Sequence, residues 1–255
     1  MPLEIVTVPC LTDNYAYLAH DPATDATAII DAPEAAPILQ ALTTRGWKAT
    51  HILLTHHHDD HIAGVPALVA ATGAKVVGAA ADAHRLPPLD VELREGDTVK
   101  IGVSAGSVIE VPGHTLGHIA FYFPDSAAVF TADSLMALGC GRVFEGTRPQ
   151  MWESLTKLAA LPPETLVYSG HEYTASNARF ALTIEPENAA LQARAAAVAA
   201  AREEGRATVP ARLEEELATN PFLRAASTPI RARLGLRDAT DAEVFGEIRG
   251  RKDRF

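Results

Sequence analysis

The side chains best suited to chemistry in this sequence are histidines and aspartates at close spacing. Four of the ten histidines fall within the six-residue run from His56 to His61, which reads His-His-His-Asp-Asp-His. Imidazole nitrogens and carboxylate oxygens are ligands that zinc, iron and manganese accept in proteins. A random scatter of a minor residue type rarely produces such a cluster. We therefore interpret the run as the core of a metal site.

Three further candidate ligands each follow an apolar stretch later in the chain. They are His114, Asp133 and His171. Loops at strand ends are where functional side chains usually project. These three residues can therefore converge on the first cluster from other parts of a sheet.

The spacing within the run predicts how it divides between two ions. A tight loop can turn His56 and His58 to one ion, while Asp60 and His61 at the start of a helix face a second. Seven groups with one shared carboxylate give each ion three terminal ligands and leave room for a bridging water. Such an open position is typical of a catalytic rather than a structural metal site.

We expect the other histidines to have no ligand role. His57 and Asp59 lie between the expected ligands and are predicted to point away from the ions, as supporting or surface groups. His118 could support a ligand, because it lies four residues after His114. The rest are interpreted as core-edge or surface residues: His20, His51 and His84.

The elements that must position these residues are strands, turns and a few helices in the first two-thirds of the chain. Runs rich in β-branched residues predict strands at 3–8, 15–18, 26–30, 52–55, 75–78, 98–103, 107–111, 119–123, 127–131 and 165–168. Helical periodicity predicts helices at 35–44, 62–72 and 151–160.

After residue 173 the sequence becomes helical in character. The Ala-rich segment 188–204 predicts a helix, since alanine has the highest helix propensity. Shorter helices are predicted at 212–218, 228–234 and 242–249. The fold class is therefore α+β, with a catalytic domain over 1–171 and a helical domain over 172–255.

Composition excludes several classes of protein. A net charge of −10 argues against nucleic-acid binding, which needs a basic surface. Two cysteines cannot frame a disulfide scaffold and suit a reducing compartment. We see no signal peptide and no apolar stretch long enough to cross a membrane. We therefore expect a cytoplasmic monomer that has neither a membrane nor a nucleic-acid partner.

The sequence resembles the metallo-β-lactamase superfamily, whose signature H-x-H-x-D-H stands here at His56 to His61. Within it the resemblance is greatest to the hydroxyacylglutathione hydrolases, also called glyoxalase II. The segments that carry it are LTDNYAYL, THHHDDHIAG, VPGHTLGHI, FTADSL, GCGRVFEG, SGHEYT and IRGRKDRF. The resemblance implies a four-layer αββα sandwich followed by a smaller helical domain that helps bind glutathione.

The resemblance also implies the ligand assignment. One divalent metal is held by His56, His58 and His114, the other by Asp60, His61 and His171, and Asp133 bridges them. Zinc is the expected metal, with iron and manganese also compatible with this set of ligands. Asp60 is further expected to orient the hydroxide.

The implied reaction is hydrolysis of S-(2-hydroxyacyl)glutathione, such as S-D-lactoylglutathione, to a 2-hydroxy acid and glutathione. A hydroxide bridging two metals attacks the thioester carbonyl. A thiol with a pKa of about 8.5 leaves readily as the thiolate, so a dedicated general acid is less necessary than for an amide. This reaction is the second step of methylglyoxal detoxification.

An acidic chain needs local positive charge to bind a substrate that carries two carboxylates and one ammonium. Residues 231–255 contain six Arg and one Lys against five acidic residues, a local balance of +2. The resemblance implies that Arg249 and Lys252 grip the glycine carboxylate of glutathione. It places in the same pocket Arg142, Phe144 and Tyr173, where Phe144 stands at a position that is tyrosine in some members.

The same residues argue against two rival functions. A glutathione persulfide dioxygenase of the superfamily uses a single iron, and the second ligand set argues against it. A non-catalytic member typically loses ligands, whereas all seven are present here. The sequence leaves open the metal identity, the acyl-group preference and the oligomeric state.

Overall fold

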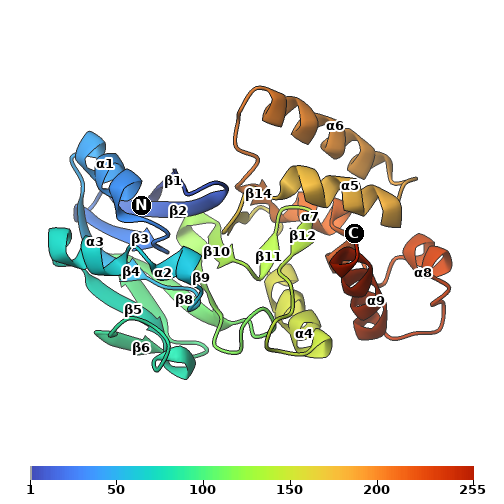
Figure 1. The fold of residues 1–255 in the computed structure, drawn as a ribbon, viewed down its shortest axis with the longest axis horizontal. Helices are drawn as coiled ribbons and strands as arrows, with labels where there is room; N and C mark the ends of the chain where they lie inside the picture. Colours follow the sequence, from blue (N-terminus) through green and yellow to red (C-terminus); the bar gives the residue numbers. More distant parts are fainter. Residues whose placement is uncertain (1) are drawn as a thin grey trace. The chain divides into compact units, whose positions relative to one another are not determined.

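The computed structural model describes residues 2–255, which divide into two compact units (Figure 1). Unit 1 comprises the chain up to Val111 together with Leu116–Ala132. Unit 2 comprises Pro112–Thr115 and Asp133–Phe255. The His56-to-His61 run therefore belongs to unit 1, whereas the later three expected ligands belong to unit 2.

The first sheet of unit 1 is mixed. Its strands lie in chain order: β1 (Glu4–Cys10), β2 (Asn14–Asp21), β3 (Ala26–Ile30), β4 (Lys48–Leu53), β5 (Lys75–Ala79) and β6 (Val91–Leu93). β1 to β3 pair antiparallel, and β3 to β6 pair parallel. Because parallel strands end at the same edge, the residues that follow β3 and β4 lie next to each other.

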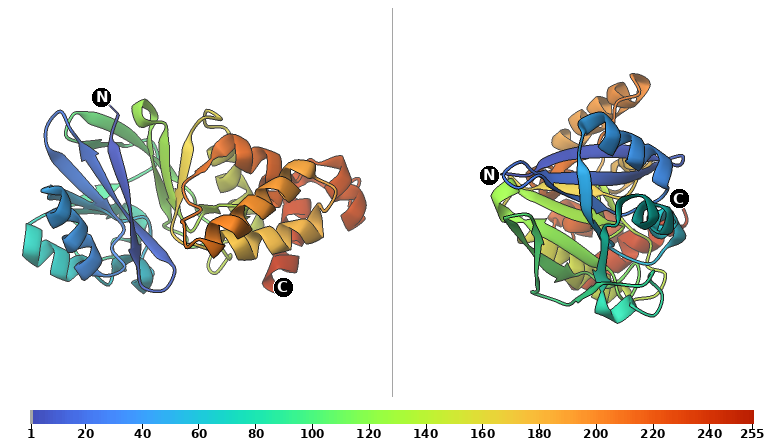
Figure 2. Two further views of the ribbon diagram at one scale, coloured as in Figure 1. Left: turned by 90° about the horizontal axis from the view of Figure 1, so that it is seen from above. Right: turned by 90° about the vertical axis from the view of Figure 1, so that its left-hand side faces the viewer.

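Two helices pack against this sheet, α1 (Ala35–Arg45) and α3 (Val65–Thr72). They lie side by side over the strands (Figure 2). The core between them is apolar and fully buried, with Leu18, Ile29 and Ile52 from the strands against Ile38 and Leu68 from the helices. Removing this much apolar surface from water is the main stabilising contribution.

A second, antiparallel sheet completes unit 1. It contains β7 (Thr98–Ile101), β8 (Ser104–Glu110), β9 (Ile119–Phe123) and β10 (Ala128–Ala132). β2 and β3 contact β7, so the two sheets face each other. Between them the rings of Tyr17 and Phe130 lie 5.6 Å apart. Three short helical segments connect the strands of this unit: α2 (Asp59–Ile62), η1 (Ala80–Asp82) and η2 (Pro124–Ser126).

Unit 2 is mostly helical. Its helices are α4 (Arg148–Ala159), α5 (Thr174–Ile184), α6 (Ala189–Glu203), α7 (Leu213–Thr219), η3 (Pro221–Leu223), α8 (Thr228–Leu234) and α9 (Asp241–Asp253). Its strands form the pairs β11 (Leu135–Met136) with β12 (Gly139–Cys140) and β13 (Leu166–Ser169) with β14 (Ala211–Arg212). Helices α5 and α6 pack along each other (Figure 2).

The α+β class is confirmed, and several local predictions are wrong. The helix expected over 62–72 begins only at Val65, as α3, and Ile62 is the last residue of a separate helix, α2. A Cβ on Gly64 would lie 2.8 Å from the backbone of Glu34, so the break follows from a close backbone approach. Helix α5 and the short strands β6, β11, β12 and β14 have no counterpart among the predicted helices and strands.

The domain boundary at 171/172 stays a prediction. None of the helices in the described chain combines the length and apolar character that a membrane span requires.

Candidate metal centre

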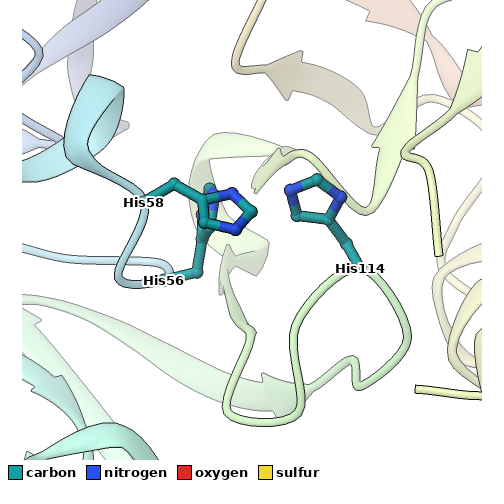
Figure 3. Close-up of side chains that lie close together, drawn as sticks. All are labelled: His56, His58 and His114. Atoms are coloured by element: carbon teal, nitrogen blue, oxygen red, sulfur yellow. The ribbon is translucent and has the colours of Figure 1, made fainter. Parts of the chain in front are cut away.

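The loop after β4 presents the first two expected ligands. It runs from Leu54 to His58, and α2 begins at the next residue, Asp59. The rings of His56 and His58 lie side by side on this loop (Figure 3), with Nε2 of His56 3.2 Å from Nδ1 of His58. His56 is fully buried and His58 is half-buried.

Asp31, the residue directly after β3, organises this loop. Its Oδ1 accepts a hydrogen bond from the Thr55 amide at 2.9 Å, and its Oδ2 accepts one from the Thr55 hydroxyl at 2.8 Å. Oδ2 also lies 2.9 Å from Nδ1 of His61. The Asp31 backbone has a φ of 55°, a left-handed conformation that is uncommon outside glycine.

These contacts determine which ring nitrogens are left for a metal. The Asp31 carboxylate only accepts, so Nδ1 of His61 carries the proton and Nε2 carries the lone pair. The Thr55 hydroxyl donates its proton to Asp31 and lies 3.0 Å from Nδ1 of His56. Because its proton is already used, the hydroxyl oxygen accepts from Nδ1 of His56, which therefore carries a proton. Nε2 is therefore the ring nitrogen that both His56 and His61 leave available to a metal, as a hydrogen bond on the other nitrogen usually dictates.

Asp60 and His61 lie on the short helix α2. Oδ2 of Asp60 is 3.9 Å from Nε2 of His61. The Asn14 side-chain amide donates to this same Oδ2 at 3.0 Å and to the Asp60 carbonyl oxygen at 2.9 Å. The Asp60 carboxylate is thus held in orientation from strand β2.

Asp31, His56 and His61 also offer atoms close enough together to hold an ion, and all three residues are buried. Both oxygens of Asp31 already accept hydrogen bonds from Thr55 and His61. We therefore interpret Asp31 as a residue that supports the ligands rather than as a ligand itself.

Unit 2 brings the other three expected ligands together around one carboxylate. Oδ2 of Asp133 lies 3.5 Å from Nε2 of His114, and Oδ1 lies 3.4 Å from Nε2 of His171. All three side chains are buried. Each oxygen of Asp133 therefore faces a different histidine, which is the arrangement a carboxylate needs to bridge two ions.

The two histidines of unit 2 are held from behind. Nδ1 of His114 lies 2.7 Å from the carbonyl oxygen of Arg142, an acceptor, so His114 also presents Nε2 to a metal. Figure 3 shows the His114 ring projecting from its own loop. The ring of His171 stacks on that of Tyr173, with centroids 4.6 Å apart and planes 7° apart.

The spacing of these atoms fits divalent ions. A tetrahedral ion with bonds of about 2.1 Å holds its ligand atoms roughly 3.4 Å apart. The His56–His58, His114–Asp133 and His171–Asp133 pairs are separated by 3.2, 3.5 and 3.4 Å. Each unit therefore presents pairs of donor atoms at the distance that one ion requires.

Some of the histidines not expected to be ligands have clear supporting contacts. Nδ1 of His57 lies 3.0 Å from the buried Asp82, so this side chain turns away from the ligand pair. His118 is fully buried and stacks on His56, with ring centroids 4.6 Å apart.

The remaining histidines lie at the edge of the core or on the surface. His20 is buried and stacks on Trp47, with centroids 4.2 Å apart. His51 is half-buried and His84 is exposed.

The residues expected to bind glutathione all lie in unit 2. Phe144 is an exposed aromatic ring that packs edge-on against His114, with centroids 5.3 Å apart, and Tyr173 is partly exposed. The Arg142 guanidinium lies 5.8 Å from the Phe144 ring centre.

Arg249 is almost completely buried at 4% exposure. Its Nη1 donates to the Cys140 carbonyl oxygen at 2.9 Å, and its Nη2 lies 2.9 Å from Oδ1 of Asp253. The Nζ of Lys252 lies 5.2 Å from the ring centre of Phe180. Burial, together with the positive charges of Arg249 and Arg179, lowers the pKa of Lys252 to about 8.

The two cysteines are free and buried. Burial raises the pKa of the Cys140 thiol to about 11, although the Arg249 charge opposes this shift. Burial and the Glu34 carboxylate raise the pKa of Cys10 to about 11 as well. Both thiols are therefore protonated at neutral pH, and neither is a nucleophile.

Three supporting residues were missed from the sequence: Asn14, Asp31 and Asp82. Asp31 carried a signal, because it follows a predicted strand as directly as the expected ligands do. Nothing in the sequence separates a carboxylate that binds a metal from one that orients a ligand.

Two models of known protein families match the chain, each over a different part of it. Residues 20–171 match the model of the metallo-beta-lactamase superfamily. Residues 172–255 match the model described as hydroxyacylglutathione hydrolase C-terminus.

Curated relatives match over the full length of the chain. The hydroxyacylglutathione hydrolase of Cereibacter sphaeroides (strain ATCC 17023) is 66% identical over 255 residues, covering 100% of both chains. The hydroxyacylglutathione hydrolase of Jannaschia sp. (strain CCS1) is 65% identical and covers 99% of this chain and 98% of its own.

Solved structures with the same fold include ETHE1 from Myxococcus xanthus. It has a TM-score of 0.65 and 28% identity, covering 98% of this chain and 97% of its own. TTHA1623 in a di-iron-bound form has a TM-score of 0.55 and 34% identity, covering 66% of this chain and 91% of its own.

Proposed function

The chain belongs to the hydroxyacylglutathione hydrolase family of the metallo-β-lactamase superfamily, and from this premise we propose how it acts. It is a metal-dependent thioester hydrolase that converts S-(2-hydroxyacyl)glutathione, such as S-D-lactoylglutathione, into a 2-hydroxy acid and free glutathione. Full-length similarity to relatives of this name favours hydrolysis over the persulfide dioxygenase and non-catalytic alternatives.

The observation that carries the proposal is the position of Asp133. Its two carboxylate oxygens lie 3.5 and 3.4 Å from Nε2 of His114 and His171 respectively. One carboxylate shared between two histidines supports a dinuclear centre, with His114 on one ion and His171 on the other. In the proposed centre His56 and His58 complete the first ligand set, and Asp60 and His61 complete the second.

Two divalent ions, with zinc as the expected metal, are proposed for each chain. The di-iron form of TTHA1623 supports the count for a related fold, since that protein holds two ions. When bound, such ions make a water nucleophilic at neutral pH and polarise a carbonyl oxygen.

The chain's own residues orient this chemistry. Asp31 fixes the ring of His61 directly and that of His56 through Thr55, so both rings present Nε2. The Asn14 amide holds the Asp60 carboxylate in place, where this carboxylate would orient the nucleophilic water or hydroxide. The thiolate of glutathione would leave without a dedicated proton donor, because a thiol is acidic enough to depart as its anion.

Substrate recognition is proposed for the basic and aromatic residues of unit 2. Arg249 and Lys252 would bind the glycine carboxylate of glutathione. The pocket is completed by Arg142, Phe144 and Tyr173. The exposed faces of Phe144 and Tyr173 support this role, because each ring also contacts a ligand histidine of the same unit.

The wider setting of the protein is also a proposal. We propose a cytoplasmic monomer, supported by two free cysteines that suit a reducing compartment. The 171/172 boundary would separate the metal-binding domain from the glutathione-binding domain. The acidic charge of −10 supports the absence of a nucleic-acid partner.

The proposal is tested by offering the purified metal-loaded protein S-D-lactoylglutathione and, separately, glutathione persulfide with oxygen. Free thiol should appear in step with loss of the thioester, and no oxygen should be consumed with the persulfide. Oxygen consumption without thioester hydrolysis would contradict the proposal.

A further inference from the structure

An arginine with no assigned role lies along helix α9. Arg148 is the first residue of α4, and its Nη2 lies 3.8 Å from Oδ2 of Asp253 at the end of α9. A Cβ on Gly250 would come within 3.0 Å of the Arg148 Nη2, and one on Gly246 within 3.5 Å of its Cδ. The two glycines, one turn apart, therefore leave a flat strip on which the Arg148 side chain lies.

The two glycines of α9 lie where the Arg148 side chain passes. Glycine disfavours a helix interior compared with alanine. At both glycines the nearest atoms outside α9 belong to Arg148. The sequence of α9 therefore accommodates an extended arginine directed toward the end of the helix.

Asp253 faces three guanidinium groups of unit 2. Arg249 donates to its Oδ1 through Nε at 3.1 Å and approaches it through Nη2 at 2.9 Å. Nε of Arg142 lies 3.7 Å from Oδ1, and Nη2 of Arg148 lies 3.8 Å from Oδ2. One carboxylate thus faces three cations, and only Arg249 is within hydrogen-bonding distance of it.

The three arginines differ in exposure. The side chain of Arg249 is 5% exposed, whereas those of Arg142 and Arg148 are 57% and 47% exposed. Arg249 is anchored within the unit, and the other two present their guanidinium groups to solvent. A second carboxylate arriving from solvent would meet two planar groups whose geometry suits it.

We propose that Arg148 and Arg142 bind a carboxylate of the glutathione thioester on the solvent side of Asp253. The Asp253 carboxylate competes with the substrate carboxylate for ion pairing with these two arginines. The inference rests on the proposed function for the identity of the ligand. It goes beyond that function by assigning binding to Arg148 and competition to Asp253.

The competing interpretation is an ordinary surface ion-pair cluster. Exposed ion pairs contribute little to stability, so Arg148→Ala would then leave binding unchanged. The two interpretations differ in how variants respond to the charge of the ligand. An experiment that varies the ligand charge therefore separates them.

The test compares wild type with Arg148→Ala on two substrates. The first is S-D-lactoylglutathione, and the second is S-lactoyl-N-acetylcysteamine, a thioester without carboxylates. Arg148→Ala should raise KM for the first substrate by about three- to tenfold with little change in kcat, as loss of one charge-assisted contact does. It should leave kcat/KM for the second unchanged, and Arg148→Lys should restore part of the affinity.

Two further variants complete the test. Asp253→Asn, which keeps an acceptor oxygen for Arg249, should lower KM for the glutathione thioester because the internal competitor is gone. The matched controls are Glu247→Gln and Arg251→Ala, which break a similar pair on the same helix with Nε 2.8 Å from Oε1. Neither control should change KM.

Equal losses on both substrates, or an unchanged KM in Arg148→Ala, would overturn the inference. Calorimetric binding of S-methylglutathione gives a readout independent of turnover, and Arg148→Ala should weaken it by a similar factor. If wild type binds S-methylglutathione but does not hydrolyse the thioester, the proposed function fails while this binding comparison still decides the inference.

Discussion

The carboxylate of Asp31 lies 2.9 Å from Nδ1 of His61, and both side chains are buried. The same carboxylate oxygen accepts the Thr55 hydroxyl, which in turn contacts Nδ1 of His56. One aspartate therefore orients two histidines that are proposed to bind different ions. A single side chain couples the geometry of both halves of the ligand set in unit 1.

We predict that Asp31→Asn weakens metal binding. An amide has one acceptor oxygen where the carboxylate has two, so it cannot accept from the Thr55 amide, the Thr55 hydroxyl and His61 together. The rings then lose their orientation, and such changes reduce metal affinity by about 10- to 100-fold. Competition with a chelator, read by metal analysis, measures the effect. Asp25→Asn is the matched control, because Asp25 is exposed and only approaches His20 at 3.9 Å. Wild-type affinity in Asp31→Asn would refute the orienting role.

Arg249→Ala should destabilise the protein as well as weaken substrate binding. The buried guanidinium contacts the Cys140 carbonyl and Asp253, and leaving such partners without it costs about 2–4 kcal/mol. Denaturant unfolding measures the loss, and KM for the thioester should rise. Arg254→Ala, at an exposed position of the same helix end, should leave the unfolding midpoint unchanged. An equally stable Arg249→Ala would show that the contact is not structural.

Lys252 should give substrate binding a pH dependence. Its pKa is lowered to about 8, so the ammonium is lost as pH rises through that value. KM for the glutathione thioester should increase above pH about 8 in wild type and stay flat in Lys252→Arg, since arginine remains charged. A KM profile with the same inflection in Lys252→Arg would assign the titration to another group.

The same shift affects folding in a defined direction. The folded protein holds the Lys252 proton less tightly than the unfolded chain, so the unfolded state binds more protons between the two pKa values. The free energy of unfolding should therefore rise between about pH 8 and about pH 10. Lys252→Met should lack this contribution when unfolding is measured across that range.

The two thiols should be inert in the folded protein. Burial raises the pKa of both Cys10 and Cys140 to about 11, so little thiolate exists at neutral pH. A chromogenic disulfide reagent should detect no thiol in the native state and two per chain after unfolding in guanidinium chloride. Rapid reaction of the native protein would show that one thiol is accessible.

Most of the longer strands could be predicted, because their β-branched, apolar runs are bounded by turn residues. β3 and β9 match the predicted ranges at both ends. Helix α5 could not, because TASNARFALTI contains several weak helix formers and its helix is stabilised by burial of residues such as Phe180 and Ile184. Tertiary packing, which the sequence does not display, decides that segment.

The candidate ligands could be predicted from type and spacing, whereas their supports could not. Asp31, which supports the candidate ligands, and Ala132, which directly precedes Asp133, both adopt left-handed backbone angles, with φ of 55° and 41°. Such angles cannot be read from the sequence of non-glycine residues. The arginine cluster around Asp253 also escaped prediction, because Arg148 and Asp253 are far apart in sequence.

In the proposed centre one carboxylate, Asp133, joins two metal sites into a single hydrolytic centre. The most direct test measures metal content and S-D-lactoylglutathione hydrolysis together in wild type and in Asp133→Ala, with the exposed Asp125→Ala as control. We predict close to two ions per chain in wild type and in the control. Asp133→Ala should lose bound metal and reduce kcat at least about a thousandfold. An Asp133→Ala protein that keeps both ions and most of its activity would contradict the claim.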